Sequence, residues 1–183
     1  MRALGLTLIL GILALDQATK YWILNIVRLP EIGQIDVSPF FDLTMVWNYG
    51  VSFGALKADA AWERWALVAL SSAIALIFSV WLTRAQRKVT ILALALVIGG
   101  AIGNVIDRIR FGAVADFLDF SAMYFPWVFN VADSAITIGA LLLAYDMFTN
   151  PDDPPQSKQK GPLKRRRDRA YRVNTLTPRI YWR

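Results

Sequence analysis

The sequence contains no histidine and no cysteine among its 183 residues. Without cysteine, disulfide bonds, thiolate catalysis and cysteine-based metal sites are excluded. Without histidine, the commonest metal ligand and the commonest base at neutral pH are missing. A metal site made of carboxylates alone is conceivable, but no ligand-dense motif supports one, and we expect no metal and no cofactor. Acid–base chemistry in this chain must therefore rest mainly on carboxylates.

Long apolar blocks dominate what is present. Hydrophobic residues make up 56% of the chain and the mean hydropathy is +0.40, which is more apolar than an ordinary soluble domain. Four blocks are each close to the ~20 residues needed to cross ~30 Å of hydrocarbon. We predict an all-α integral membrane protein with four spans, over residues 3–27, 62–83, 89–107 and 127–148. The first block lacks an A-x-A-like cleavage site, so we expect it to be a retained helix rather than a signal peptide.

Positive charge predicts how these spans are oriented. The turn after the second block carries Arg84, Arg87 and Lys88 without an acidic residue, and residues 151–183 hold half of all Lys and Arg. By the positive-inside rule, we expect this turn and both termini to be cytoplasmic. We interpret residues 151–183 as a disordered basic tail attracted to anionic lipids. Nucleic-acid binding is the alternative for the tail, but nothing else in the chain supports it.

Residues 29–61 and 108–126 should then face outward, and residues 1–150 should form one membrane domain. Within the first segment, residues 40–46 (FFDLTMV) are β-prone and lie between turn signals. This pattern predicts a small β-rich element on the outer surface. In the second segment, we expect an interfacial loop or helix around residues 117–125.

Polar residues of three spans fall at one depth. With a rise of ~1.5 Å per residue, Asp16, Asn104 and Asp133 all lie roughly 20 Å above the inner edge. The inner half is almost free of charge, so the sequence predicts one shared polar site that opens outward. A small-residue face at Gly99, Gly100 and Gly103 should let another helix approach closely.

The carboxylates of this layer differ in their surroundings. Asp16 and Lys20 are four residues apart and should form an ion pair, which makes Asp16 a poor candidate for sharing a proton. Asp107 and Arg108 lie near the membrane edge, where we expect salt bridges that clamp loops. Asp133 has no basic residue within four positions, so it should have a raised pKa or share a proton. A neutral, structural aspartate that caps or bridges helices is the alternative.

Asp116 is the second carboxylate of interest, since apolar neighbours on both sides would hold it against the membrane. Two carboxylates that share a proton form a natural acid–base pair. A Ser52–Lys57 nucleophile pair is a weaker possibility. An ion-coupled transporter would use intramembrane carboxylates too, but it should have polar groups at all depths or inverted repeats. A non-enzymatic assembly factor is a third reading.

Five short blocks resemble, in order, those of the lipoprotein signal peptidase (signal peptidase II) family. They are DQATK at 16–20, NYGVSFG at 48–54, GGAIGNVIDR at 99–108, VADF at 114–117 and FNVAD at 129–133. The resemblance spans about 150 residues and leaves out the basic tail. It implies an aspartic endopeptidase of the bacterial inner membrane, with an active site near the periplasmic face. Such enzymes remove the signal peptide of diacylglyceryl-modified prolipoproteins just before the lipidated cysteine.

Carried over by position, the resemblance implies that Asp116 and Asp133 are the catalytic pair, while which of them holds the proton stays open. It also implies residues that shape or hold the site: Asp16, Lys20, Asn48, Gly54, Asn104, Asp107, Arg108 and Asn130. Expected partners are lipid-modified prolipoproteins, membrane lipids and globomycin-type cyclic peptide inhibitors, and the protein is expected to be a monomer without nucleic acid. We expect the acyl chains of the substrate to lie near the small-residue face.

Overall fold

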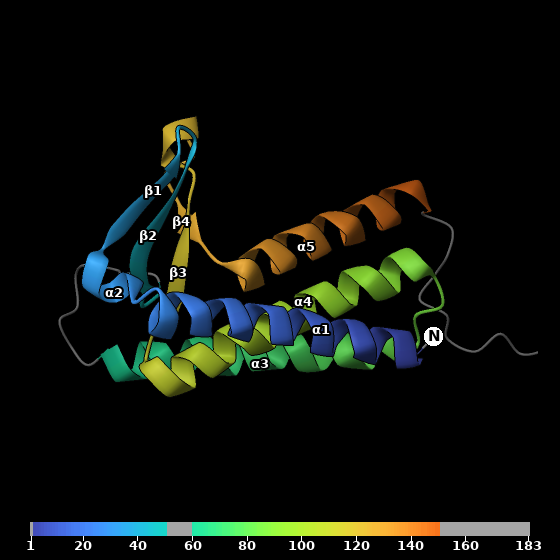
Figure 1. Ribbon diagram of the computed structural model, residues 1–183. Coiled ribbons are helices and arrows are strands. Elements are labelled where there is room, and N and C mark those ends of the chain that lie inside the picture. The colour runs from blue at the N-terminus through green and yellow to red at the C-terminus, as the bar shows by residue number, and fades with distance from the viewer. Residues whose placement is uncertain (1, 51–59, 151–183) are drawn as a thin grey trace, which may run out of the picture.

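The computed structural model describes residues 2–50 and 60–150 of the chain (Figure 1). Within these residues, four helices are long and apolar enough to cross a membrane: Ala3–Ile26, Trp62–Leu82, Lys88–Phe111 and Val131–Thr149. The first of them consists of α1 (Arg2–Tyr21) and a π-helical turn η1 (Trp22–Ile26), and the others belong to α3 (Ala60–Leu82), α4 (Lys88–Phe111) and α5 (Val131–Thr149). The prediction of four spans is confirmed.

Two of the predicted boundaries are wrong at their outer ends. The third span extends to Phe111 rather than to residue 107, and it stops where Gly112 adopts a left-handed conformation with φ of 83°. The fourth span begins at Val131 rather than at residue 127, because Asn130 caps the helix in an extended conformation. Arg108 therefore lies within a helix, and Trp127 lies outside one.

Helix α4 forms the centre of the bundle, with α1, α3 and α5 packed around it. Two-thirds of its apolar window is buried, compared with under a third in each other span. A methyl group added to the small-residue face would meet Ile12 at Gly99, the backbone of Ala132 at Gly100, and Asp16 at Gly103. The prediction of close helix approach is confirmed. α1 and α5 occupy the face itself, and the expectation that acyl chains lie near it stays a prediction.

A four-stranded antiparallel sheet stands at the outer end of the bundle. Its order is β1 (Gln34–Ser38), β2 (Phe41–Asn48), β3 (Val114–Asp119) and β4 (Val128–Phe129), and a short helix α2 (Leu29–Ile32) precedes it. Strand β2 confirms the prediction that residues 40–46 form part of a β-rich element. The loop or helix expected around residues 117–125 is wrong at its start, where β3 extends to Asp119, and is confirmed for residues 120–125, which form a loop with the 3-10 turn η2 (Ser121–Met123). All of β3 except Leu118 is buried, so its sequence lacks the alternation that marks a half-exposed strand.

The strands run across the ends of the helices, roughly perpendicular to the helix axes (Figure 1). At its root the sheet is anchored by Phe117, which packs with Ile23 and Leu29 in a buried cluster. This arrangement brings the middle of β3 to the start of α5, so residues from two distant parts of the chain meet at the outer end of the bundle.

Candidate functional site

Asp133 is fixed in the first turn of α5 by a reciprocal cap. The backbone N–H of Asp133 donates to Asn130 Oδ1 at 3.0 Å, and the backbone N–H of Asn130 donates to Asp133 Oδ2 at 3.4 Å. The other oxygen of Asp133 accepts a hydrogen bond from Asn104 Nδ2 at 2.8 Å. Asp133 thus caps its helix and still presents a half-buried carboxylate.

Asp116 lies on β3, buried to 1% exposure, rather than in a loop. Asn130 Nδ2 donates to Asp116 Oδ1 at 2.6 Å, and Asn48 Nδ2 donates to Asp116 Oδ2 at 3.0 Å. The side chain of Asn130 therefore contacts both Asp116 and the backbone of Asp133. The structure brings the two predicted aspartates to the same place, joined by one amide.

Burial raises the pKa of Asp116 to about 6, and the neighbouring carboxylate of Asp133 adds to this rise. The hydrogen bonds from Asn48 and Asn130 act in the opposite direction, since they favour the ionised form. Asp116 is therefore able to gain and lose a proton near neutral pH, which an ordinary exposed aspartate does not do.

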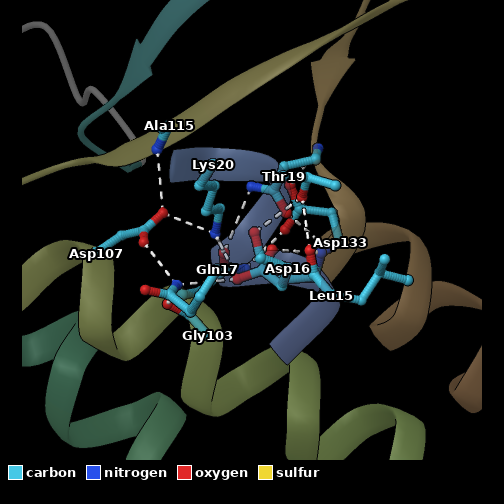
Figure 2. Close-up of polar contacts among 12 residues, drawn as sticks. Leu15, Asp16, Gln17, Thr19, Lys20, Gly103, Asp107, Ala115 and Asp133 are labelled. Carbon is cyan, nitrogen blue, oxygen red and sulfur yellow. Dashed lines mark hydrogen bonds and ion pairs between the residues drawn. The ribbon is translucent and has the colours of Figure 1, made fainter. Parts of the chain in front are cut away.

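Lys20 forms the cationic centre of a second buried group next to this pair. Its Nζ lies 3.0 Å from Asp16 Oδ2 and 2.7 Å from Asp107 Oδ2, and all three side chains are nearly inaccessible. Figure 2 shows the Lys20 side chain pointing between the two carboxylates. The predicted Asp16–Lys20 pair is confirmed. Asp107 pairs with Lys20 rather than with Arg108, because adjacent residues on a helix do not face each other.

Each carboxylate of this group also holds a backbone segment of the site. Asp107 Oδ2 accepts a hydrogen bond from the N–H of Ala115 at 3.3 Å, which ties α4 to β3. Asp16 Oδ1 accepts a hydrogen bond from the N–H of Ala132 at 3.0 Å, which ties α1 to the first turn of α5. Asp107 therefore holds an outer strand by a hydrogen bond, and among the described residues neither Asp107 nor Arg108 forms the expected salt bridge to an outer loop.

Asn104 links the Lys20 group to the aspartate pair. Lys20 Nζ donates to Asn104 Oδ1 at 3.3 Å, and Asn130 Nδ2 lies 3.4 Å from the same oxygen. With its oxygen held by these donors, the amide nitrogen of Asn104 faces Asp133. Lys20 thus fixes the orientation of the amide that holds Asp133.

Gln17 belongs to the site but was not among the candidates derived from the sequence, where it appeared only inside the first matched block. Its Nε2 donates to Asp16 Oδ2 and to Asp107 Oδ1, both at 3.1 Å. The sequence feature that indicates a role for Gln17 is its position as a neutral polar residue next to Asp16 in an apolar span.

Arg108 faces the site without a salt bridge among the described residues. Its Nη1 makes one long hydrogen bond to the carbonyl oxygen of Asn104 at 3.5 Å, and its buried Nε has no partner in residues 2–50 and 60–150. It interacts electrostatically with Asp133, Asp116 and Asp107. A guanidinium with an unused donor beside two carboxylates is suited to hold a polar group of a bound molecule.

Three residues considered from the sequence, Gly54, Ser52 and Lys57, lie outside the described residues. Within the described part, no group of three or more acidic side chains is placed to hold a metal ion.

The fold and the sequence both match known proteins. The family model described as signal peptidase (SPase) II matches residues 8–149. A lipoprotein signal peptidase of Caulobacter vibrioides is 44% identical over 76% of this chain and 83% of its own length. One of Rhizorhabdus wittichii is 50% identical over 78% of this chain and 84% of its own.

Among solved structures, a bacterial membrane enzyme determined by the in meso method at 2.3 Å resolution superposes with a TM-score of 0.69. It is 25% identical and covers 87% of this chain and 94% of its own. The match therefore covers most of both chains. With a family model covering most of the chain and relatives matched over most of their length, this multi-pass membrane protein belongs to the signal peptidase II family of proteases.

Proposed function

We propose that this protein is an aspartic endopeptidase that removes the signal peptide of diacylglyceryl-modified prolipoproteins just before the lipidated cysteine. Membership of the family supports prolipoprotein cleavage. The observation that carries the aspartic mechanism is the contact of the Asn130 side chain with both Asp116 and the backbone of Asp133. In this proposal, the two carboxylates activate water between them, as an acid and a base.

Asp133 is the better candidate for the base. Its oxygens accept N–H groups from Asn104 and from the backbone of Asn130, and it lies at the positive end of α5. Ionised Asp133 takes a proton from a water molecule, and the resulting hydroxide oxygen attacks the scissile carbonyl carbon. Asp116 is the better candidate for the acid, because its pKa of about 6 allows it to hold a proton. It donates that proton to the carbonyl oxygen.

The tetrahedral intermediate then collapses. The carbonyl re-forms as the C–N bond breaks, the proton held by Asp133 passes to the leaving amine, and the intermediate returns a hydroxyl proton to Asp116. Arg108 is the candidate for holding the peptide or its developing oxyanion, since its Nε has no partner within the described residues. Asn48, Asn104 and Asn130 orient the pair, and Asp16, Lys20 and Asp107 support that arrangement.

The proposed site lies near the periplasmic face of the inner membrane, with both termini cytoplasmic. Arg84, Arg87 and Lys88 support this orientation, because they lie at the opposite end of the bundle from the sheet. We further propose that the protein is a monomer, that it contacts membrane lipids, and that globomycin-type cyclic peptides inhibit it.

The direct test is cleavage of a purified substrate. The full chain, reconstituted in phospholipid vesicles, is incubated with a diacylglyceryl-modified prolipoprotein, and the product is followed by electrophoretic mobility. We expect a shift for the lipidated precursor, with a new amino terminus at the modified cysteine. The same precursor without the lipid is the control. Absence of cleavage, or cleavage elsewhere, would contradict the proposed reaction.

The proposed roles also predict the pH dependence of kcat/KM. Activity requires Asp116 to be protonated, so kcat/KM should fall as pH rises through about 6, the pKa of Asp116 in the free enzyme. The Asn48 hydrogen bond lowers this pKa. Replacing Asn48 by Ala should therefore move the alkaline limb of the profile to higher pH.

Thr44→Val is the matched control for this measurement. Thr44 Oγ1 donates to Asp119 Oδ2 at 2.7 Å, so this variant removes a similar hydrogen bond from a different aspartate of β3. Its alkaline limb should stay in place. If Asn48→Ala left the limb unmoved, or moved it to lower pH, Asp116 would not be the acid.

A further inference from the structure

Two exposed, uncharged loops form the far end of the sheet. One joins β1 to β2 and contains Phe40, and the other joins β3 to β4 and includes residues 120–127. No charged residue lies between Asp36 and Asp42 or between Asp119 and Asp133. Large apolar side chains in these loops are well exposed, with Phe40 at 56%, Met123 at 59% and Trp127 at 66%. We call these two loops the distal tip.

Aromatic contacts hold the two loops together as one unit. The rings of Phe41 and Phe120 lie 4.9 Å apart, and Phe120 stacks on Phe129 at 5.7 Å. Phe125 packs edge-on against both Trp127 and Phe129. Because the inner rings of this cluster hold the loops, the exposed side chains are presented on a preorganised apolar surface rather than on two independent loops.

The sheet next to the distal tip has one apolar and one acidic face. Residues paired across antiparallel strands share a face. The pairs Asp36–Asp42 and Asp42–Asp119 therefore place three carboxylates on one side. The pairs Ile35–Leu43, Leu43–Leu118 and Leu118–Phe129 place apolar side chains on the other side.

The apolar face looks toward the membrane-spanning part of the molecule. Asp116 is two residues from Leu118 on β3 and so shares its face, and Asp116 contacts Asn130 at the start of α5. The distal tip extends sideways past the outer end of α5, and it reaches no farther outward than the outer ends of α3 and α4 (Figure 1). It therefore lies beside the bundle, near the level of the outer ends of the predicted spans.

We propose that the distal tip is a membrane anchor whose exposed side chains insert into the outer leaflet beside α5. Aromatic side chains favour this interfacial region, and burial of apolar area there favours insertion. On the acidic face, Asp36 is exposed to water. The anchor fixes the depth of β3, and with it the depth of Asp116. This inference concerns the outer sheet alone and does not depend on the proposed reaction.

The absence of native cysteine allows a site-specific test. Single cysteines replace Met123 or Phe40, one in each loop, and carry an environment-sensitive fluorophore. Leu76→Cys, on the exposed middle of α3, is the control within lipid. Asp36→Cys, on the acidic face, is the control in water. The full-length variants are reconstituted into vesicles of phosphatidylethanolamine and phosphatidylglycerol, with and without phosphatidylcholine dibrominated near its carbonyl groups. Only labelled variants that unfold thermally like the unlabelled chain are used.

We expect both tip labels to emit at shorter wavelength than the label at position 36. Brominated lipid should quench them strongly, and aqueous iodide should quench them several-fold less than the position-36 label. With bromines near the carbonyl groups, quenching should be stronger at the tip than at Leu76. Iodide quenching at both tip positions equal to that at position 36, or no quenching by brominated lipid, would overturn the proposal.

Discussion

Replacing Asp116 or Asp133 by Asn is expected to abolish prolipoprotein cleavage while the protein stays folded. Each substitution keeps the shape of the side chain but removes a group that must gain or lose a proton. General acid–base catalysis contributes roughly 10²- to 10⁴-fold per group. Since each aspartate acts twice in the proposed cycle, we expect losses of kcat/KM at or above the upper end of this range. The measurement is cleavage of a lipidated precursor in vesicles.

Asp119→Asn is the matched control for these variants. Asp119 lies on the same strand as Asp116, but it accepts hydrogen bonds from Thr44 and from the backbone of Ser121 instead of from the site. Its variant should retain most of the activity. Near-normal cleavage by either Asp116→Asn or Asp133→Asn would rule out the aspartate pair as the catalyst.

The Asp116 variant should also change how stability depends on pH. The folded-state pKa of Asp116 is about 6, compared with 3.8 for an ordinary aspartate. The folded state therefore binds its proton more tightly, and stability should fall as pH rises from about 4 to about 6. Asn cannot ionise, so this part of the pH dependence should be absent from Asp116→Asn. Thermal unfolding in detergent across this range separates a folded, inactive variant from an unfolded one.

Replacing Lys20 by Met is expected to cause the largest loss of stability in the bundle. The substitution leaves Asp16 and Asp107 buried without their cation. Removing one partner of a buried ion pair costs about 3–5 kcal/mol, because the remaining charge is uncompensated. Asn104 Oδ1 also loses its bond from Lys20, so the variant should cleave more slowly even where it remains folded. The unfolding temperature in detergent is the readout.

Two further variants distinguish the effect of the uncompensated charges on stability from the effect of changed side-chain packing. Lys88→Met removes an exposed lysine of α4 and should change the free energy of unfolding by less than about 0.5 kcal/mol. Adding Asp16→Asn and Asp107→Asn to Lys20→Met removes the stranded charges and should restore part of the lost stability. If the triple variant were no more stable than Lys20→Met, packing rather than charge would explain the loss.

The sequence predicted the spans and the ion pair well because both depend on local spacing. Apolar blocks of sufficient length must cross the membrane as helices, since only a helix satisfies its own backbone there. Asp16 and Lys20 are one helical turn apart, so their contact follows from α1 alone. The depth of Asp133 also follows from its position in one helix, although that helix begins at Val131, four residues after the predicted start at residue 127.

The partners of Asp107 and the conformation of Asp116 depend on contacts between distant parts of the chain. Asp107 meets Lys20 only because α1 packs on α4. Asp116 lies in a strand because Val114–Asp119 pairs with β2, whose residues lie about 70 positions earlier. Nothing in the local sequence of β3 indicates that pairing, which is why Asp116 required the family resemblance.

The Lys20 group has a consequence for how the protein is made. Asp16 and Lys20 enter the bilayer together on the first helix, where their 3.0 Å pair cancels both charges. Asp107 and the N–H of Ala132 reach the membrane later, with α4 and α5. Before α4 is present, the Lys20 ammonium has Asp16 as its ion-pair partner but lacks the contacts that it makes with Asp107 and Asn104 in the folded protein. Asp107 of α4 contacts Lys20, and the N–H of Ala132 at the start of α5 contacts Asp16. The two charged residues of the first helix therefore each hold one later helix, and the contacts that support the site also join the bundle.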